Sequence, residues 1–158
     1  MDISIRNAHQ DDYESLLPLF RQVHDLHVFE RPDLYKENST PVGKEFFLSQ
    51  LIDPKQHIFV ATIGLEIIGL VVTKEEDITE NSFVNARKLL YENSLCVSET
   101  YRNKGVGKRL MQYVIDFGGS LKVNSIELGV SENNASAYSV YTSFGMTTKC
   151  RIMEFRLN

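Results

Sequence analysis

The most constraining feature of this sequence is an apolar run that leads, through a polar loop, into a helix that begins with glycines. Leu95-Cys96-Val97 is typical of a buried strand, and residues 98–104 are polar. Gly105-Val106-Gly107 then begins a segment in which apolar residues recur at helical spacing. A strand that passes into a helix in this way indicates a fold in which strands and helices alternate.

The rest of the second half continues this alternation. The pattern predicts a helix through Leu121, a strand over 125–130, a helix over 134–144 and a last strand over 150–157. Strands and helices in this order predict a mixed α/β sheet. The 158 residues contain no repeat, low-complexity block or linker, so we expect one domain over residues 1–158.

The first half predicts shorter and less regular elements. In order, these are a strand over 3–6, a helix capped by Asp11 or Asp12 and running through Val23, a long loop over 24–42, a helix over 44–51, strands over 58–63 and 67–73, a polar connector over 74–86 and a strand over 87–97. Pro18 lies within the first helix and should bend or shorten it, because proline removes an amide donor.

The residues around the two glycines predict an anionic ligand. The first amides of a helix have no partner within the helix and carry the positive end of its dipole, so a phosphate can bind there. Arg102, Lys104, Lys108 and Arg109 add positive charge to a chain whose formal net charge is −4. That overall acidity argues against a general nucleic-acid binder. A plain glycine turn with a solvated basic face is the alternative at this point.

Two familiar phosphate-binding loops do not fit the segment. A Walker loop needs a first glycine at the position of Arg102, and a serine or threonine at the position of Arg109. A dinucleotide-binding fingerprint needs a third glycine at the position of Leu110. Glu127 follows Gly107 at the distance of a ribose-binding acid, which leaves nucleotide binding as an alternative.

A second pattern lies in the helix predicted over residues 134–144. Asn134, Ala137 and Tyr141 fall along one face of that helix, and Gly145 follows it as a natural cap. Taken alone, a tyrosine on such a face more often belongs to the core than to a catalytic site.

Together the two segments resemble the GNAT superfamily of N-acetyltransferases. Arg102-x-x-Gly105-x-Gly107 is similar to its coenzyme motif R/Q-x-x-G-x-G/A, and Asn134, Ala137, Tyr141 and Gly145 are similar to its later pattern N-x-x-A-x-x-x-Y-x-x-x-G. The resemblance implies an α/β (α+β) fold with a mixed sheet of about six or seven strands and about four helices. It also implies direct acetyl transfer from acetyl-CoA to an amine, without a metal. A noncatalytic CoA-binding module on the same fold is the alternative.

The resemblance implies roles for individual residues as well. The implied coenzyme-binding residues are Leu95, Cys96, Val97, Arg102, Asn103, Lys104, Gly105, Val106, Gly107, Lys108, Asn134 and Tyr141. The amides of residues 102–107 would hold the pyrophosphate, and backbone groups of Leu95 and Val97 would bind the pantetheine arm. Because the transfer is direct, Cys96 is not expected to be a nucleophile.

Tyr141 is implied as the general acid that protonates the leaving thiolate. A phenol has a pKa of about 10 and a thiol of about 8.5, so this transfer needs help from geometry. The acceptor amine must itself lose a proton, and Glu92 is the candidate base, with Glu30 second. Asn93 and Ser94 occupy the positions where relatives often carry an acid.

The segment after the first helix is expected to select the acceptor. Its acids and aromatic residues suit a cationic amine of a small molecule, peptide or protein; they are His24, Asp25, His27, Phe29, Glu30, Asp33 and Tyr35. His24 and His27 lack a third ligand, so no metal is expected. Only one strand is predicted after Gly145, so the acceptor wall is either abbreviated or completed by another subunit in a homodimer.

The remaining features predict a cytoplasmic protein without nucleic-acid or membrane partners. The start of the chain lacks the basic and apolar regions of a secretory leader, and no apolar stretch approaches the roughly 20 residues that cross a bilayer. Cys96 and Cys150 form no CxxC pair, which is consistent with a reducing compartment.

Overall fold

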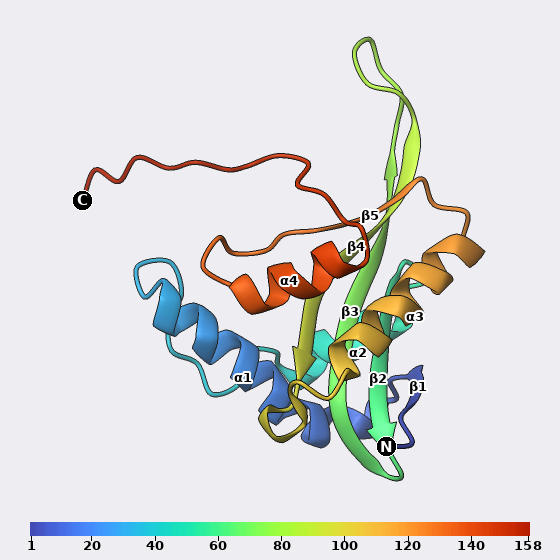
Figure 1. Cartoon of the computed structure of the whole chain (residues 1–158), viewed down its shortest axis with the longest axis vertical. Coiled ribbons are helices and arrows are strands. Elements are labelled where there is room, and N and C mark those ends of the chain that lie inside the picture. The colour runs from blue at the N-terminus through green and yellow to red at the C-terminus, as the bar shows by residue number, and fades with distance from the viewer.

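The computed structural model describes residues 1–158, which form one five-stranded sheet with helices packed on it (Figure 1). The strands are β1 (Ser4–Asn7), β2 (Gln56–Ile63), β3 (Glu66–Ile78), β4 (Arg87–Val97) and β5 (Ser125–Leu128). Their order in the sheet is their order in the chain. The first four strands are antiparallel to their neighbours, whereas β5 runs parallel to β4.

Helices cover both faces of the sheet. They are α1 (Tyr13–Glu30), α2 (Lys44–Ile52), α3 (Val106–Ser120) and α4 (Ala135–Ser143), with 3-10 turns at Gln10–Asp12 and Glu99–Tyr101. Val60 and Leu70 pack with residues of α1 and α2, while Phe59 and Val71 pack with α3. Since neighbouring strand residues point to opposite faces, α1 and α2 lie on one face and α3 on the other. None of the helices is both long enough and apolar enough for a membrane span.

The α/β class is confirmed, and so is the number of helices, but the expected number of strands was too high. The last predicted strand, over residues 150–157, is wrong, because residues 146–158 have no secondary structure. Alternating residues form a strand only where a neighbour offers a free edge, and the backbone of residues 147–158 makes no hydrogen bond within the chain.

Two boundaries also differ from the sequence prediction. Residues 24–30 are helical rather than loop, and α1 continues past Pro18 to Glu30. The amide that Pro18 lacks would have bonded the carbonyl of Glu14 in the first turn, so only one hydrogen bond near the helix start is lost. β3 reaches Ile78 and thereby includes residues 74–78 of the predicted connector.

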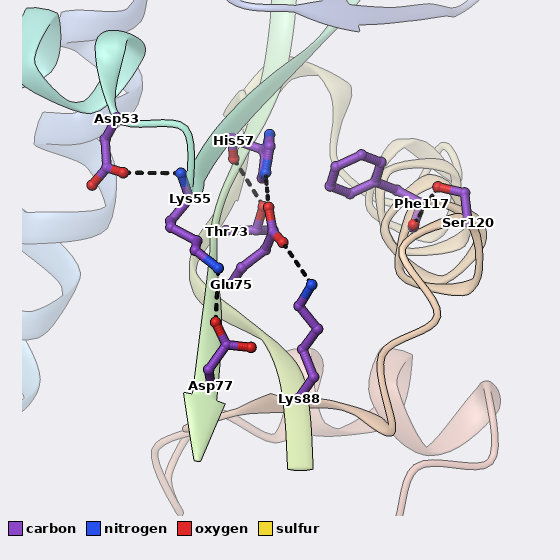
Figure 2. A network of polar contacts seen from close by, with 9 residues as sticks. All are labelled: Asp53, Lys55, His57, Thr73, Glu75, Asp77, Lys88, Phe117 and Ser120. Carbon is purple, nitrogen blue, oxygen red and sulfur yellow. Dashed lines mark hydrogen bonds and ion pairs between the residues drawn. The ribbon is translucent and has the colours of Figure 1, made fainter. Parts of the chain in front are cut away.

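This long arm of β3 is held by polar side chains (Figure 2). His57 Nε2 lies 2.7 Å from a carboxylate oxygen of Glu75, and Lys88 Nζ approaches the other oxygen at 3.6 Å. Lys55 bonds Asp77 at 2.7 Å farther along the arm. The polar composition therefore reflects cross-strand pairs on an exposed hairpin rather than a missing strand.

Candidate active site

The sheet opens between β4 and β5. β4 pairs with β5 only over Leu89–Glu92, whereas its other edge stays paired with β3 as far as Val97. The β3 register shifts at this point and passes over Asn93, which is a β-bulge. Residues 93–97 therefore have no strand neighbour on their β5 side, so an extended ligand can bond that edge.

The unpaired edge leads to a loop whose amides are free. Asn103 and Gly105 adopt left-handed backbone angles, with φ of 61° and 82°. The first helical bond runs from the Arg109 amide to the Gly105 carbonyl at 3.0 Å, and no acceptor within the chain bonds the amides of residues 103–108. The Arg102 amide makes one long bond, 3.4 Å, to the Glu99 carbonyl. Consecutive free amides at a helix start are an anion-binding arrangement.

Four cations around these amides have no partner. Arg102, Lys104, Lys108 and Arg109 are exposed, and none forms an ion pair within the chain. The ammonium of Lys104 lies 5.4 Å from the centre of the Tyr101 ring. The positive end of α3 is thus reinforced rather than neutralised.

The two glycines of the loop serve different purposes. Gly105 caps α3 with a positive φ, which glycine adopts without strain. A Cβ on Gly107 would meet side-chain atoms of Val97 and Leu95 at 3.6 and 3.8 Å, which is ordinary contact. Packing does not require glycine at position 107, but close approach of a ligand to the backbone would.

Helix α4 brings the two candidate catalytic residues together. Asn134 caps the helix, and its Oδ1 accepts a bond from the Ala137 amide at 3.1 Å. Tyr141 lies two turns later, and its hydroxyl donates to Glu92 Oε1 at 3.3 Å. Glu92 is only 5% exposed, and its second oxygen, Oε2, has no partner.

Burial sets the proton affinity of this pair. Desolvation raises the pKa of Glu92 to about 7, although the hydrogen bond from Tyr141 counteracts part of the change. Burial, together with the charge of Glu92, raises the pKa of Tyr141 above its ordinary value. A carboxyl group with a pKa near 7 can take up or release a proton at neutral pH.

Comparison with known proteins identifies the family. The family model described as acetyltransferase (GNAT) family matches residues 20–146. This chain belongs to the GNAT acetyltransferase family. It is 27% identical over 148 residues to the L-amino acid N-acetyltransferase AaaT of Escherichia coli (strain K12), a match that covers 91% of this chain and 82% of that protein.

Solved structures support the fold of this acetyltransferase. The BH1408 protein from Bacillus halodurans superposes with a TM-score of 0.95 and 31% identity, over 98% of this chain and 99% of its own. The aminoglycoside N-acetyltransferase AAC(6')-Iy, solved with CoA, superposes with a TM-score of 0.74 over 98% of this chain and 94% of its own. At 17% identity this second match shows the fold alone.

A cleft of about 240 Å³ lies beside the open part of β4 in this acetyltransferase. His24 and His27 of α1, and Asn93 and Ser94 of β4, belong to its wall. The expected gathering of acidic side chains is wrong, because no carboxylate lines this cleft and Asp25, Glu30 and Asp33 all lie outside its wall. Residues 24–30 are helical, so only one face of α1 reaches the cleft.

Other candidates from the sequence are engaged elsewhere. Cys96 is buried, and burial raises the pKa of its thiol to about 12, so a nucleophilic thiolate is disfavoured. Glu127 bonds Lys149 and Arg87, which lower the pKa of its carboxyl to about 2. These bonds occupy the only acid that supported a ribose-binding alternative.

Sequence analysis missed Gln22, which ties α1 to the end of β4. Its Nε2 donates to the Val97 carbonyl at 2.7 Å, and its Oε1 accepts from the Glu99 amide at 3.2 Å. The side chain thus fixes both sides of the turn into the loop. A single glutamine in an amphipathic helix carries no motif, so only the three-dimensional arrangement reveals this role.

Proposed function

We propose that this acetyltransferase uses acetyl-CoA and transfers the acetyl group directly to a primary amine of a small molecule or peptide. The observation that carries the proposal is the continuous path from the unpaired edge of residues 93–97 to the free amides of residues 103–108. This path offers backbone bonds to an extended arm and then amide donors to a diphosphate.

In this proposal each part of the coenzyme meets a suitable group. The pyrophosphate binds the amides of residues 103–108, and Arg102 and Lys108 add charge. The pantetheine arm lies along Leu95 and Val97 as an extra strand. Val97 would contribute its amide, since its carbonyl already accepts from Gln22. The similar fold of an aminoglycoside acetyltransferase that was solved with CoA supports this assignment.

The chemistry would occur where the paired part of β4 ends. The amine nitrogen attacks the thioester carbon, a C–N bond forms, and the C–S bond breaks. Tyr141 gives its proton to the departing thiolate as general acid. The 3.3 Å bond to Glu92 is long for a hydroxyl donor, so the hydroxyl is not tightly held and can turn toward the sulfur.

Glu92 would complete the proton balance. Glu92, directly or through a water, takes the proton that the amine loses and passes it to the Tyr141 phenolate. The transfer is downhill because the pKa of Glu92, about 7, lies well below that of Tyr141. The carboxyl group is therefore restored to its charged form after each turnover.

The cleft favours a small acceptor. A volume of about 240 Å³, walled by two histidines and neutral groups, admits an amino acid or a compound of similar size more readily than a polycation. The relative AaaT carries an L-amino acid N-acetyltransferase activity in its name, which supports the same class of acceptor.

A thiol-release assay with acetyl-CoA and an amine panel tests the proposal. We expect release with at least one amino acid or small amine, and a fall of about 10²–10⁴-fold in kcat for Tyr141→Phe. Tyr138→Phe is the matched control, because Tyr138 lies on the same helix and is 47% exposed. CoA binding without turnover of any amine would favour a noncatalytic module instead.

A further inference from the structure

The C-terminal tail, residues 147–158, leaves the molecule as an extended segment beyond α4 (Figure 1). Its backbone makes no hydrogen bond within the chain. Four large apolar side chains are almost fully exposed: Ile152 at 98%, Met153 at 90%, Phe155 at 88% and Leu157 at 85%. Monomeric proteins rarely expose so much contiguous apolar surface, so this tail needs a cover.

Ion pairs fix which side of the tail needs that cover. Glu154 bonds Arg31 at 2.7 Å and Arg156 lies 3.2 Å from Asp33, so both side chains face the end of the chain's own α1. In an extended segment the alternate side chains point the opposite way. Met153, Phe155 and Leu157 therefore form an apolar stripe that faces away from the body of the molecule.

The course of the tail is shared with a solved structure. Residues 147–158 make up about 8% of the 158 residues, yet the BH1408 protein superposes at a TM-score of 0.95 over 98% of this chain. Most of the tail must therefore superpose. An extended segment with no backbone bonds of its own needs an external surface to hold it in one course.

The sheet offers such a surface on β5. This strand pairs with β4 alone, so its second edge is unpaired. Unpaired edges accept strands from other chains. The tail has the alternation of a strand but no sheet, and its ion pairs to residues 31 and 33 lead it away from its own β5.

We propose that two copies of this chain form a dimer by exchanging their tails. Residues 150–157 of each copy add as a strand to the free edge of β5 in the second copy, and Met153, Phe155 and Leu157 become buried. A reciprocal exchange gives a closed, two-fold symmetric pair. It would also supply, from the second copy, the last strand that the alternation of residues 150–157 predicts.

The apolar area is sufficient for a stable dimer. A large apolar side chain buries on the order of 150 Å², so four in each of two tails contribute about 1,200 Å² before the covered surfaces are counted. Specific protein interfaces begin at about this total area.

Sedimentation of the full chain across a concentration series tests the dimer. The native protein should have twice its 18.1 kDa chain mass. The double variant Met153→Asp/Phe155→Asp should weaken the dimer by at least about 100-fold in dissociation constant. Its circular dichroism should be unchanged, because neither side chain packs within the chain. Phe83→Asp is the matched control, since Phe83 is 85% exposed in the β3–β4 connection and lies outside the tail.

Hydrogen exchange separates tail exchange from other dimers. In the native protein the amides of residues 150–157 should be protected, and the double variant should lose that protection. A native chain that is monomeric at every concentration, a dimer that survives the double substitution, or tail amides that exchange as fast as in a free peptide would each overturn the proposal.

Discussion

The two ends of β4 differ in their hydrogen bonding, and this difference creates the candidate site. Residues 89–92 are paired on both edges, with β3 and β5, and include the buried Leu89 and Leu90. Residues 93–97 are paired with β3 alone. The first part closes the core, whereas the second leaves polar groups free and leads to the amides of residues 103–108. Binding capacity thus arises where regular pairing stops.

The boundary between these two parts is chemically distinct. Glu92 is the last β4 residue that pairs with β5, and its buried carboxylate bonds Tyr141. Buried polar groups without partners cost free energy, so the orphaned Oε2 of Glu92 and the free loop amides must both be offset elsewhere in the fold. Substitutions on either side of the boundary should therefore have opposite signatures, in ligand affinity or in stability.

The largest effect is expected from closing the open side at Gly107. Gly107→Val leaves room for the fold but puts a branched side chain where a diphosphate would meet the backbone. We expect CoA affinity to fall by about 100-fold, or about 3 kcal/mol, when measured by calorimetry. Gly119→Val is the control, because Gly119 lies in the same helix with open space around it. Equal loss of affinity in both variants would contradict the ligand contact at Gly107.

The paired side should respond in stability through Glu92. Its pKa in the folded protein, about 7, lies above its ordinary value of 4.5. The native protein is therefore favoured below pH 4.5 and loses stability as the pH rises through 7. At about 1.36 kcal/mol per pKa unit this loss approaches 3 kcal/mol, and Glu92→Gln should abolish it.

Chemical denaturation at pH 4.5 and pH 8 measures that difference. The native protein should lose about 2–3 kcal/mol more than Glu92→Gln between the two conditions. Glu80→Gln is the control, because Glu80 is exposed in the β3–β4 connection and should leave the native pH dependence unchanged. Parallel pH dependence in the native protein and Glu92→Gln would show that Glu92 is not strained by burial.

A smaller effect is expected from the cations of the open side. Lys108→Ala should weaken CoA binding by about tenfold and should reduce the dependence of affinity on salt, because an exposed cation acts through screened attraction. Lys122→Ala, beyond the far end of α3, should change neither quantity. Unchanged salt dependence in Lys108→Ala would mean that this ammonium does not contact the anion.

The smallest effect is expected from the side chain that ties the open part to α1. Gln22→Leu removes two hydrogen bonds, to Val97 and Glu99, and should lower the free energy of unfolding by about 1 kcal/mol. The KM for acetyl-CoA should rise several-fold while kcat is retained. Gln112→Leu, which loses only a surface bond to Asp116, should leave KM unchanged. A loss of kcat at constant KM would contradict a positioning role.

Local patterns were sufficient to predict the elements that carry the site. The bounds of β4, Arg87–Val97, and the start of α3 follow from short runs of apolar and glycine residues. The face shared by Asn134 and Tyr141 follows from helical spacing alone. The pairing of Tyr141 with Glu92, far apart in sequence, required the folded sheet and could only be expected as a resemblance.

The features that sequence analysis missed depend on neighbours rather than on local pattern. The opening between β4 and β5 is set by where β5 ends, at Leu128. The helix over residues 24–30 forms in a polar stretch because it continues α1. The tail alternates as a strand does, yet no edge within the chain pairs with it.

The most direct test of the account is a titration of ¹⁵N-labelled protein with CoA, followed by the amide signals of the loop. The account predicts that the signals of residues 103–108 shift most at saturation, ahead of those of the paired residues 89–92. Binding that leaves the 103–108 amides unshifted, or no binding at all, would contradict the claim that these free donors form the coenzyme site.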